Sequence, residues 1–515
     1  MRIHRALLIL LALLLVSSQH AWGQVSDNGL ISESLSQRMG LRRQWYLQVP
    51  MNPYSEQIID IDLHVSNTEA RWEYEVVLGN KRWIYSERDL DNFRRPQGKE
   101  VAERLANVHH LRLQREMKDA KLISHPTPVI RLATMTDQGQ VVLLDAESGQ
   151  VLWERSLGGR NQISLGVSTS DRFTVAAVGL TIYVLDNKNG SIVWERDVKT
   201  IPGAAPAISE TTVFVPSIRD RIESYYLFNE EEFPGMYPSP GRVVVKPTVG
   251  STTIAWPTDK GKVYVGSINK PKMRYRLQAH DKIVSRIAYL PPSRYVATSM
   301  DGFIYCFQEV SGEILWHFTT GQPITQPATL LEDSTYVVTS EHRLYCIDSN
   351  TGSGKWFVRN IDRFISKSES RLYCLDTLNR LVVLDSETGG RILTAAAGSI
   401  DLTLLNDKTD RIYLGSKSGL IQCLREPGQD YPLLHAGISE RIVKGVVEEE
   451  DPAQPAAGQP PVQPPAAGNN PFAPANKPAG NNPFAPAAKP NPAPPKKDPF
   501  GVPDPFGAND PFKNN

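Results

Sequence analysis

The chain has 515 residues, 22% of them charged, and its 56 basic residues balance its 56 acidic ones. A neutral chain of this length has room for a large core, and no net charge draws it to nucleic acid or an anionic membrane. It has four cysteines, none adjacent to another and none in a C-x-x-C pair, which excludes a disulfide framework and a zinc or redox pair of that type.

Residues 1–23 have the pattern of a secretory signal peptide. Arg2 and Arg5 precede an apolar run from Ala6 to Val16, and the small residue Ala21 lies near the expected cleavage point. No cysteine lies near that point, so a lipid-anchored lipoprotein is not indicated, and no other apolar run is long enough to span a membrane. We therefore expect an exported protein, periplasmic or extracellular, without a membrane span.

Residues 24–124 form an N-terminal extension that precedes the first clear repeat. The segment 45–49 (WYLQV) predicts a strand. Residues 99–118 predict an amphipathic helix that caps or flanks the main domain. The helix prediction rests on four apolar residues at helical spacing: Val101, Leu105, Val108 and Leu111.

A phrase then recurs along the chain, and its first copy is VVLLDAESGQVLWERSLGG at 141–159. We call the position of the Asp in this phrase the slot. In the clearest copies the slot is occupied by Asp145, Asp186, Gln308, Asp348 and Asp385. The slots 145 and 186 are 41 residues apart, and 308 and 348 are 40 apart. Weaker copies, with slots near Leu227, Ser267 and Arg425, complete eight units of about 40 residues.

Each unit combines a strand, a tight turn and a second strand. The alternating β-branched run before the slot predicts the strand. In D-x-x-[S/T/N]-G the carboxylate can accept backbone N–H groups and the Gly supplies a positive φ, so a hairpin turn is expected. The Trp four residues after the Gly is expected to pack between units, where its ring buries much area. The structural residues of the repeat are Asp145, Gly149, Trp153, Asp186, Gly190, Trp194, Gly312, Trp316, Asp348, Gly352, Trp356, Asp385 and Gly389.

Four strands in each unit of this length are typical of a propeller blade. The predicted fold class is all-β: an eight-bladed β-propeller of four-stranded blades over 125–447, with the extension and its helix before it. The strand at 45–49 can complete a blade and help to close the ring. A solenoid is the alternative, although its coils are usually shorter or helical.

The pattern L-D-x-x-[S/T]-G-x-x-[L/V]-W resembles the repeat of the PQQ-type, or quinoprotein, propellers over about 129–435. Units one, two, five and six carry it best, whereas Leu393 replaces the Trp of the seventh unit. That family includes dehydrogenases that hold PQQ and Ca²⁺ on the propeller axis. It also includes non-enzymatic propellers such as BamB, a component of outer-membrane protein assembly.

The chain departs from the enzyme pattern of that family. Many of the dehydrogenases have a disulfide between adjacent cysteines over the cofactor, and this chain has no such pair. No calcium carboxylate set or catalytic Asp can be mapped onto it. Asp60 and Asp62 share one face of a predicted strand, but two carboxylates without a nucleophile are weak evidence for acid–base catalysis. We therefore predict no catalytic, cofactor-binding or metal-binding residue.

The resemblance implies a non-catalytic scaffold for protein–protein interaction, with envelope or outer-membrane protein assembly as its candidate setting. Its expected partners are proteins bound by a propeller face and by the C-terminal tail. A PQQ- or metal-dependent oxidoreductase is the alternative. The oligomeric state and the identity of the partners stay open.

Residues 448–515 are rich in Pro, Ala, Gly and Asn and predict a disordered tail, because this composition buries too little apolar surface to offset ordering. Five N/D-P-F triplets in it end in Phe472, Phe484, Phe500, Phe506 and Phe512. Each Phe is a candidate anchor for a partner, and several weak anchors on one chain gain avidity. A tail that only acts as a spacer explains the composition equally well.

Overall fold

The computed structural model describes residues 29–435, except for 90, 92–94, 117, 160, 230 and 399. The chain divides into two compact units, Met1–Pro452 and Ala453–Asn515, and all described residues belong to the first. The predicted signal peptide and the predicted tail with its Phe triplets lie outside the described residues.

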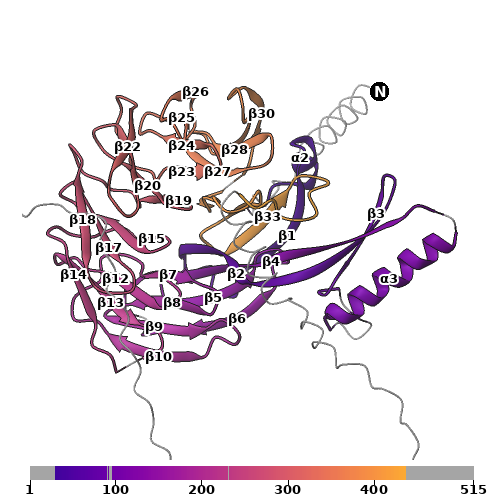
Figure 1. Cartoon of the computed structure of the whole chain (residues 1–515), viewed down its shortest axis with the longest axis horizontal. Helices are drawn as coiled ribbons and strands as arrows, with labels where there is room; N and C mark the ends of the chain where they lie inside the picture. The colour runs from indigo at the N-terminus through magenta and orange to yellow at the C-terminus, as the bar shows by residue number, and fades with distance from the viewer. Residues whose placement is uncertain are drawn as a thin grey trace, which may run out of the picture. The chain divides into compact units, whose positions relative to one another are not determined.

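The described chain forms eight antiparallel sheets, and blades 2 to 7 each contain four consecutive strands. Their bounds are β7 (Ser164–Thr169), β8 (Phe173–Val178), β9 (Thr181–Asp186) and β10 (Ile192–Asp197); β11 (Ala207–Ile208), β12 (Thr212–Pro216), β13 (Arg221–Tyr226) and β14 (Gly235–Pro238); β15 (Thr248–Val249), β16 (Thr253–Pro257), β17 (Lys262–Ser267) and β18 (Met273–Gln278); β19 (Ala288–Leu290), β20 (Arg294–Thr298), β21 (Phe303–Gln308) and β22 (Ile314–Thr319); β23 (Thr329–Leu331), β24 (Ser334–Val338), β25 (Arg343–Asp348) and β26 (Gly354–Arg359); β27 (Arg363–Lys367), β28 (Arg371–Leu375), β29 (Arg380–Asp385) and β30 (Arg391–Ala396). The first strands of neighbouring blades contact one another in chain order, from β7 through β11, β15 and β19 to β23. The sheets therefore stand around a common axis, and the predicted eight-bladed all-β propeller is confirmed (Figure 1).

Blades 1 and 8 meet where the ring closes. Blade 1 consists of the first half of β2 (Ile58–Leu78), the second half of β4 (Lys121–Thr136), β5 (Gln140–Asp145) and β6 (Val151–Ser156). Blade 8 takes β31 (Leu402–Thr403), β32 (Ile412–Gly415) and β33 (Leu420–Arg425) from the end of the described chain. Its fourth strand is β1 (Arg42–Gln48), which pairs with β33 and places Trp45 opposite Cys423.

The position of a strand in its blade determines how it is buried. All six residues of β8, the second strand of blade 2, are buried, because both faces of the sheet are covered by neighbouring blades. The outermost strand β10 buries Trp194 and exposes most of its other side chains. The four cysteines, Cys306, Cys346, Cys374 and Cys423, are all buried and unpaired, and they act as small apolar side chains.

The repeated Trp and Gly lie against each other across blade boundaries. The indole N–H of Trp153 donates to the carbonyl of Asn187 in blade 2 at 2.9 Å, and a Cβ added to Gly190 would lie 2.7 Å from the Trp153 ring. Trp316 bonds Ser349 in the same way, at 2.9 Å, and faces Gly352. Because Gly190 has φ +67°, both its backbone conformation and the adjacent ring require glycine there.

Trp45 makes the same contact from the strand that closes the ring. Its N–H donates to the carbonyl of Ala146 in blade 1 at 2.9 Å, and its ring covers Gly149. Arg411 of blade 8 is fully buried beside it and bonds Glu147 of blade 1 at 3.1 Å. The two ends of the propeller are thus joined by the indole of an N-terminal strand and by a buried ion pair between blades 8 and 1.

A small arm extends from blade 1. The second half of β2 pairs with the first half of β4 and with β3 (Lys81–Ser86), and this sheet is covered by α3 (Lys99–Arg115), as Figure 1 shows. A shorter helix, α2 (Glu33–Arg38), begins at the N-cap Ser32 and precedes β1. The predicted helix at 99–118 is confirmed, but it ends at Arg115.

The apolar stripe on which the helix prediction rested does not face the protein. Leu105, Val108 and Leu111 are exposed, whereas Ala102, Ala106 and Leu113 form the buried face. The reason is that the sheet below supplies large rings, including Trp83 and Tyr85, and small alanines let the helix approach them closely.

We predict that Trp45→Ala lowers the free energy of unfolding by about 3–5 kcal/mol, because it leaves a cavity at the junction that closes the ring. Urea unfolding followed by Trp fluorescence and circular dichroism measures the change. The neighbouring residue Tyr46, which is 60% exposed, gives the matched control Tyr46→Ala. Equal losses in the two variants would contradict a special role for Trp45.

Candidate functional site

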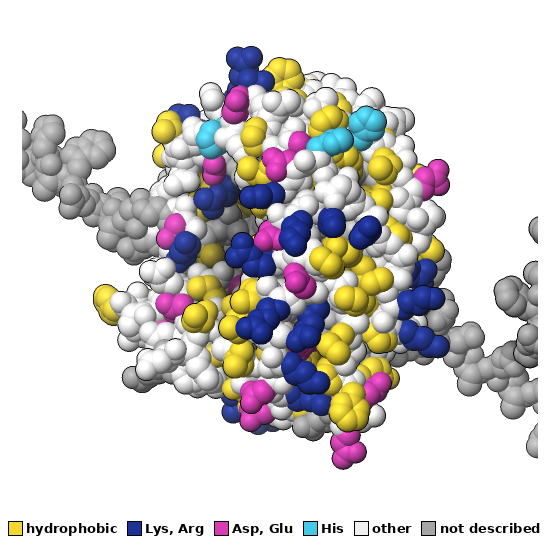
Figure 2. All heavy atoms as spheres, turned by 90° about the vertical axis from the view of Figure 1, so that its left-hand side faces the viewer, with side chains coloured by type: hydrophobic (Ala, Val, Ile, Leu, Met, Phe, Trp, Pro, Cys, Tyr) yellow, Lys and Arg dark blue, Asp and Glu magenta, His cyan; other side chains and the backbone are white. Residues whose placement is uncertain are grey.

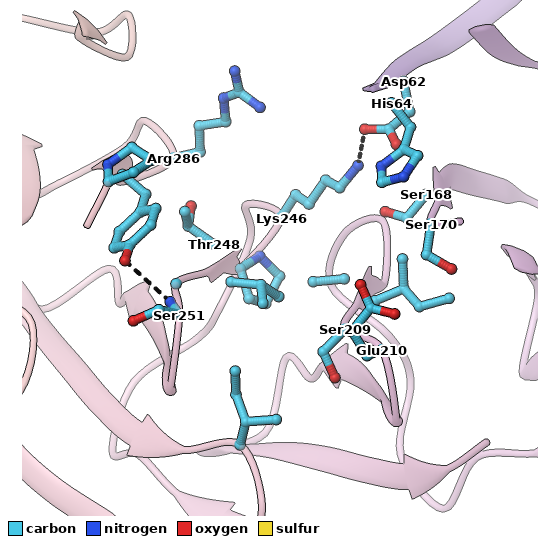
Figure 3. Close-up of a pocket in the computed structure, with 18 of the residues that line it drawn as sticks. Asp62, His64, Ser168, Ser170, Ser209, Glu210, Lys246, Thr248, Ser251 and Arg286 are labelled. Carbon is cyan, nitrogen blue, oxygen red and sulfur yellow. Dashed lines mark hydrogen bonds and ion pairs between the residues drawn. The ribbon is translucent and has the colours of Figure 1, made fainter. Parts of the chain in front are cut away.

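A pocket of about 600 Å³ lies among the first strands of the blades. Its walls come from β2, β7, β11, β15 and β19, and from the loop between β31 and β32. The labelled side chains in Figure 3 are all polar or charged, and Lys246 reaches toward Asp62. Because these strands belong to consecutive blades around the ring, the pocket is axial.

Asp60 and Asp62 connect the first strands of blades 1 and 2. Their Oδ2 atoms accept hydrogen bonds from the backbone N–H groups of Val167 and Thr169, each at 2.8 Å. Lys246 donates to the other oxygen of Asp62 at 2.5 Å. Burial alone would raise the pKa of Asp62, but the ammonium groups of Lys246 and Lys408 hold it below its usual value. Burial raises the pKa of Asp60.

A loop between β31 and β32 enters the pocket and supplies charges of both signs. Lys408 donates to the carbonyl of Leu63, and burial lowers the pKa of its ammonium group. Arg286 lies 3.7 Å from Asp407 of the same loop. Lys246 and Lys408 are therefore hydrogen-bonded within the protein, whereas Arg286 has only the longer contact with Asp407.

His64 forms a second short contact beside the pocket, with its Nε2 2.6 Å from Oδ1 of Asp171. Asp171 also accepts from the backbone N–H of Asn67 and from the hydroxyl of Thr68. Burial disfavours the charged form of Asp171, but these donors outweigh it and lower its pKa to about 2. Burial lowers the pKa of His64, so a neutral imidazole donates its N–H to the carboxylate.

The hydroxyl groups in the pocket wall are used in structural hydrogen bonds. Ser168 donates to the carbonyl of Pro206 at 2.6 Å, and Ser209 donates to that of Thr212 at 3.1 Å. Ser251 donates to the carboxylate of Glu309 at 2.7 Å. No hydrogen bond links any of these hydroxyls to His64 among the described residues, so no nucleophile–base pair is formed there.

The pocket does not fit a calcium-bound quinone. A carboxylate-rich quinone needs cations that are free to bind it, and the two lysines of the pocket are already hydrogen-bonded within the protein. Calcium needs several oxygen ligands around one point. Within 29–435, less the gaps noted above, no group of three or more Asp, Glu, His or Cys side chains could hold a metal ion.

His435 lies behind the loop that enters the pocket. Its backbone N–H donates to the carbonyl of Lys408 at 3.1 Å, and its side chain is 2% exposed. Neither ring nitrogen has a hydrogen-bond partner among the described residues. Burial and the neighbouring Lys367 lower the pKa of His435 to about 4.

The repeat residues have the local contacts that their types suggest. Asp145, Asp348 and Asp385 each accept backbone N–H groups of their own turns through Oδ1. The second oxygen of Asp145 has a further role, because Arg71 and Arg88 of the arm bond it at 3.1 and 2.8 Å. None of the repeat residues lines the pocket.

Sequence reasoning missed Lys246, Arg286 and Lys408. Each lies in a loop beside a short first strand, outside the repeated phrase, and isolated basic residues there resemble an ordinary solvated surface. Of the ionic groups in the pocket, only Asp62 was identified from the sequence. The signal was the alternation of side chains along a strand, which places Asp60 and Asp62 on one face.

Blades 3 and 4 differ from the others at the turn that normally carries D-x-x-[S/T]-G. Blade 3 has a longer turn, in which Phe228 is 50% exposed and Phe233 is 90% exposed. The guanidinium of Arg172 lies 5.5 Å from the Phe228 ring. The corresponding region of blade 4 exposes four basic residues that form no salt bridge among the described residues: Lys270, Lys272, Arg274 and Arg276.

Figure 2 shows this side of the propeller, where Lys and Arg side chains gather over a surface that also contains hydrophobic side chains. A neutral chain thus has a locally basic edge next to an exposed aromatic turn. Aromatic and Arg side chains are the types enriched at protein interfaces.

We predict that His435→Leu reduces the dependence of stability on pH. The folded-state pKa of His435 is below its ordinary value of 6.5, so the neutral form stabilises the fold fully above pH 6.5. This contribution is lost as pH falls toward 4, by up to about 3 kcal/mol.

Urea unfolding at pH 7.5, 5.5 and 4 measures the effect, and His317→Leu, at an exposed site, is the control. Equal pH profiles for wild type and His435→Leu would contradict the prediction.

A family model and solved structures match the chain. The family model described as outer membrane protein assembly factor BamB matches residues 86–222 and 253–413. BamB from Moraxella catarrhalis is 16% identical with a TM-score of 0.48, covering 58% of this chain and 92% of that one. The computationally designed Ika8 protein is 14% identical with a TM-score of 0.47, covering 57% and 92%. No curated protein sequence matched the chain.

Within the part of the chain that the structure describes, no helix is both long and apolar enough to cross a membrane. The PQQ-like repeat propeller expected from the sequence is confirmed by the family model and by the eight sheets. Because the matched residues make up more than half of the 515, the chain belongs to the BamB family of outer membrane protein assembly factors.

Proposed function

We propose that the chain is an exported, non-catalytic propeller scaffold that binds other proteins during envelope or outer-membrane protein assembly. Family membership supports the general role of a propeller scaffold. The observation that carries the proposal is that both lysines of the axial pocket, and the hydroxyls of its wall, are bonded within the protein. A surface role fits this arrangement better than chemistry on the axis.

The aromatic turn of blade 3 is the part of the propeller best suited to contact a partner. Phe233 presents almost its whole ring to solvent, and Phe228 lies beside Arg172 and Tyr226. Aromatic and Arg anchors supply much of the binding energy in protein interfaces when a partner buries them. The basic edge of blade 4 adds attraction for an acidic partner.

The tail offers a second, independent contact. Its five Phe anchors are separated by Pro-rich sequence, so a partner with several sites, or several partners, can engage them together. The spacer role stays open beside this one, because a chain of this composition also separates two bodies without binding either.

We predict that a photocrosslinker at position 233 captures a specific protein in the native host and that one at position 378 does not. Leu378 is 69% exposed in blade 7 and is therefore a matched control. Phe228→Ala together with Phe233→Ala should weaken the captured complex at least about tenfold, because the anchors are lost. Equal capture at both positions would contradict a contact at blade 3.

The same crosslinking with and without residues 448–515, and with all five tail Phe changed to Ala, tests the tail. We expect the Phe changes to remove those partners that depend on the tail while circular dichroism of the propeller stays the same. Full retention of every partner would refute recognition by the tail and leave the spacer role.

The quinoprotein alternative has a direct test. Adding PQQ and Ca²⁺ to the purified full chain should give no bound quinone absorbance and no dye-linked alcohol oxidation, because both pocket lysines are already bonded and the described residues hold no metal-binding cluster. A stoichiometric quinone spectrum after gel filtration would overturn the non-catalytic assignment.

A further inference from the structure

The arm on blade 1 has its own core; β2 and β4 continue into it from the blade, and ionic contacts at its base add to this connection. Tyr74 and Val76 of β2 pack against Ala102, Ala106 and Leu113 of α3. At the base of the arm, Arg71 and Arg88 both bond Asp145, and these three side chains are less than a third exposed. The arm therefore holds α3 in a defined position on blade 1.

The inner side of α3 is fixed by contacts with β3. His109 lies edge-on to Trp83, with ring centroids 4.8 Å apart, and its Nδ1 is 2.8 Å from the hydroxyl of Tyr85. These contacts determine which side of the helix faces solvent.

The outer side of α3 combines aliphatic and Arg side chains. Leu105, Val108 and Leu111 are 38%, 59% and 51% exposed. Arg104, Arg112 and Arg115 are exposed among them. At about 3.6 residues per turn, these six residues and Val101 occupy roughly a third of the helix circumference, and no acidic residue falls within that sector.

The charges of this sector are largely unneutralised. Arg104 and Arg115 form no salt bridge among the described residues, and Arg112 has only a 3.6 Å contact with Glu116, which also bonds Lys118. Basic and aliphatic groups on one exposed face complement a surface on which carboxylates and aliphatic groups alternate.

The arrangement favours a protein helix over a lipid surface as the occupant. A helix that lies in a membrane interface has a broad apolar face, often with Trp or Phe, and keeps its basic residues on the other side. On α3 the Arg side chains are interleaved with the aliphatic ones, and no aromatic residue lies in the sector. Spacing of three and four residues between contacts is that of one helix packing along another.

We propose that the outer face of α3 is a docking site for an acidic amphipathic helix of a partner protein, a helix with an aliphatic seam bordered by Asp or Glu. The site is separate from the aromatic turn and the tail of the proposed scaffold. If no helix docks on α3, the proposed scaffold function still stands. If the aromatic turn and the tail bind no partner, docking on α3 is unaffected.

Fluorescence anisotropy with the full chain and two labelled helical peptides tests the proposal: one composed of Leu and Glu in an amphipathic pattern, the other with Lys in place of Glu. We expect the Leu/Glu peptide to bind at least about tenfold more tightly than the Leu/Lys peptide, and more weakly as salt rises. Val108→Asp should reduce that binding about tenfold, whereas Leu378→Asp at the exposed site in blade 7 should leave it unchanged.

Reversing the charges gives a second test that does not depend on the apolar contact. Arg104→Glu together with Arg115→Glu, both at exposed positions, should reverse the preference toward the Leu/Lys peptide. The proposal is overturned if the Leu/Glu peptide fails to bind, if Val108→Asp leaves its binding unchanged or if the preference does not reverse.

Two further measurements identify other occupants. Binding of phosphatidylglycerol vesicles that is lost in Val108→Asp would assign the face to a membrane. Sedimentation equilibrium showing self-association that is lost in the same variant would assign it to a second copy of the chain. Either result would replace the proposed occupant.

Discussion

The contact between an aromatic ring of one blade and the turn of the next is the interaction on which the rest of the structure depends. Trp45, Trp153 and Trp316 each donate an N–H to a carbonyl just after the slot of the repeat and cover the Gly of that turn. A blade cannot bury its two faces alone, so its stability comes from these neighbours. Tyr275 preserves the contact in blade 4, where its hydroxyl bonds the carbonyls of Gln308 and Glu309.

Because the repeated residues are used in contacts between blades, they determine the fold, and residues outside the repeat are the ones available to bind a partner. The side chains that recur are committed to neighbouring blades, and a change in them would alter a junction before it altered a surface. The blades differ from one another at turns that extend into solvent, such as the turn of blade 3 that exposes Phe233. The axial pocket follows the same logic, because Asp60 and Asp62 use their carboxylates to hold β7.

The sequence predicts the eight units because Asp, Gly and Trp recur at a regular spacing, and each blade of a propeller uses the same turn and the same contact with its neighbour. The arm was less predictable. Ala102 and Ala106 give little hydrophobic signal, yet they form the buried side of α3, whereas Leu105 and Val108 gave the signal and face solvent. The ionic groups of the pocket were also largely hidden from sequence reasoning, because Lys246 and Asp62 are 184 residues apart and meet only when blades 1 and 4 are both in place.

The strand that closes the ring has a consequence for the order of events during synthesis. Trp45 pairs across from Cys423, 378 positions later, so β1 leaves the ribosome long before β33 exists. At about 5–20 residues per second, the interval is roughly 20–80 s. During that time the edge of β1 has no partner within its own blade, and an unpaired strand edge readily joins another chain. The time at which the ring can close is therefore set by its last blade, however quickly the earlier blades form.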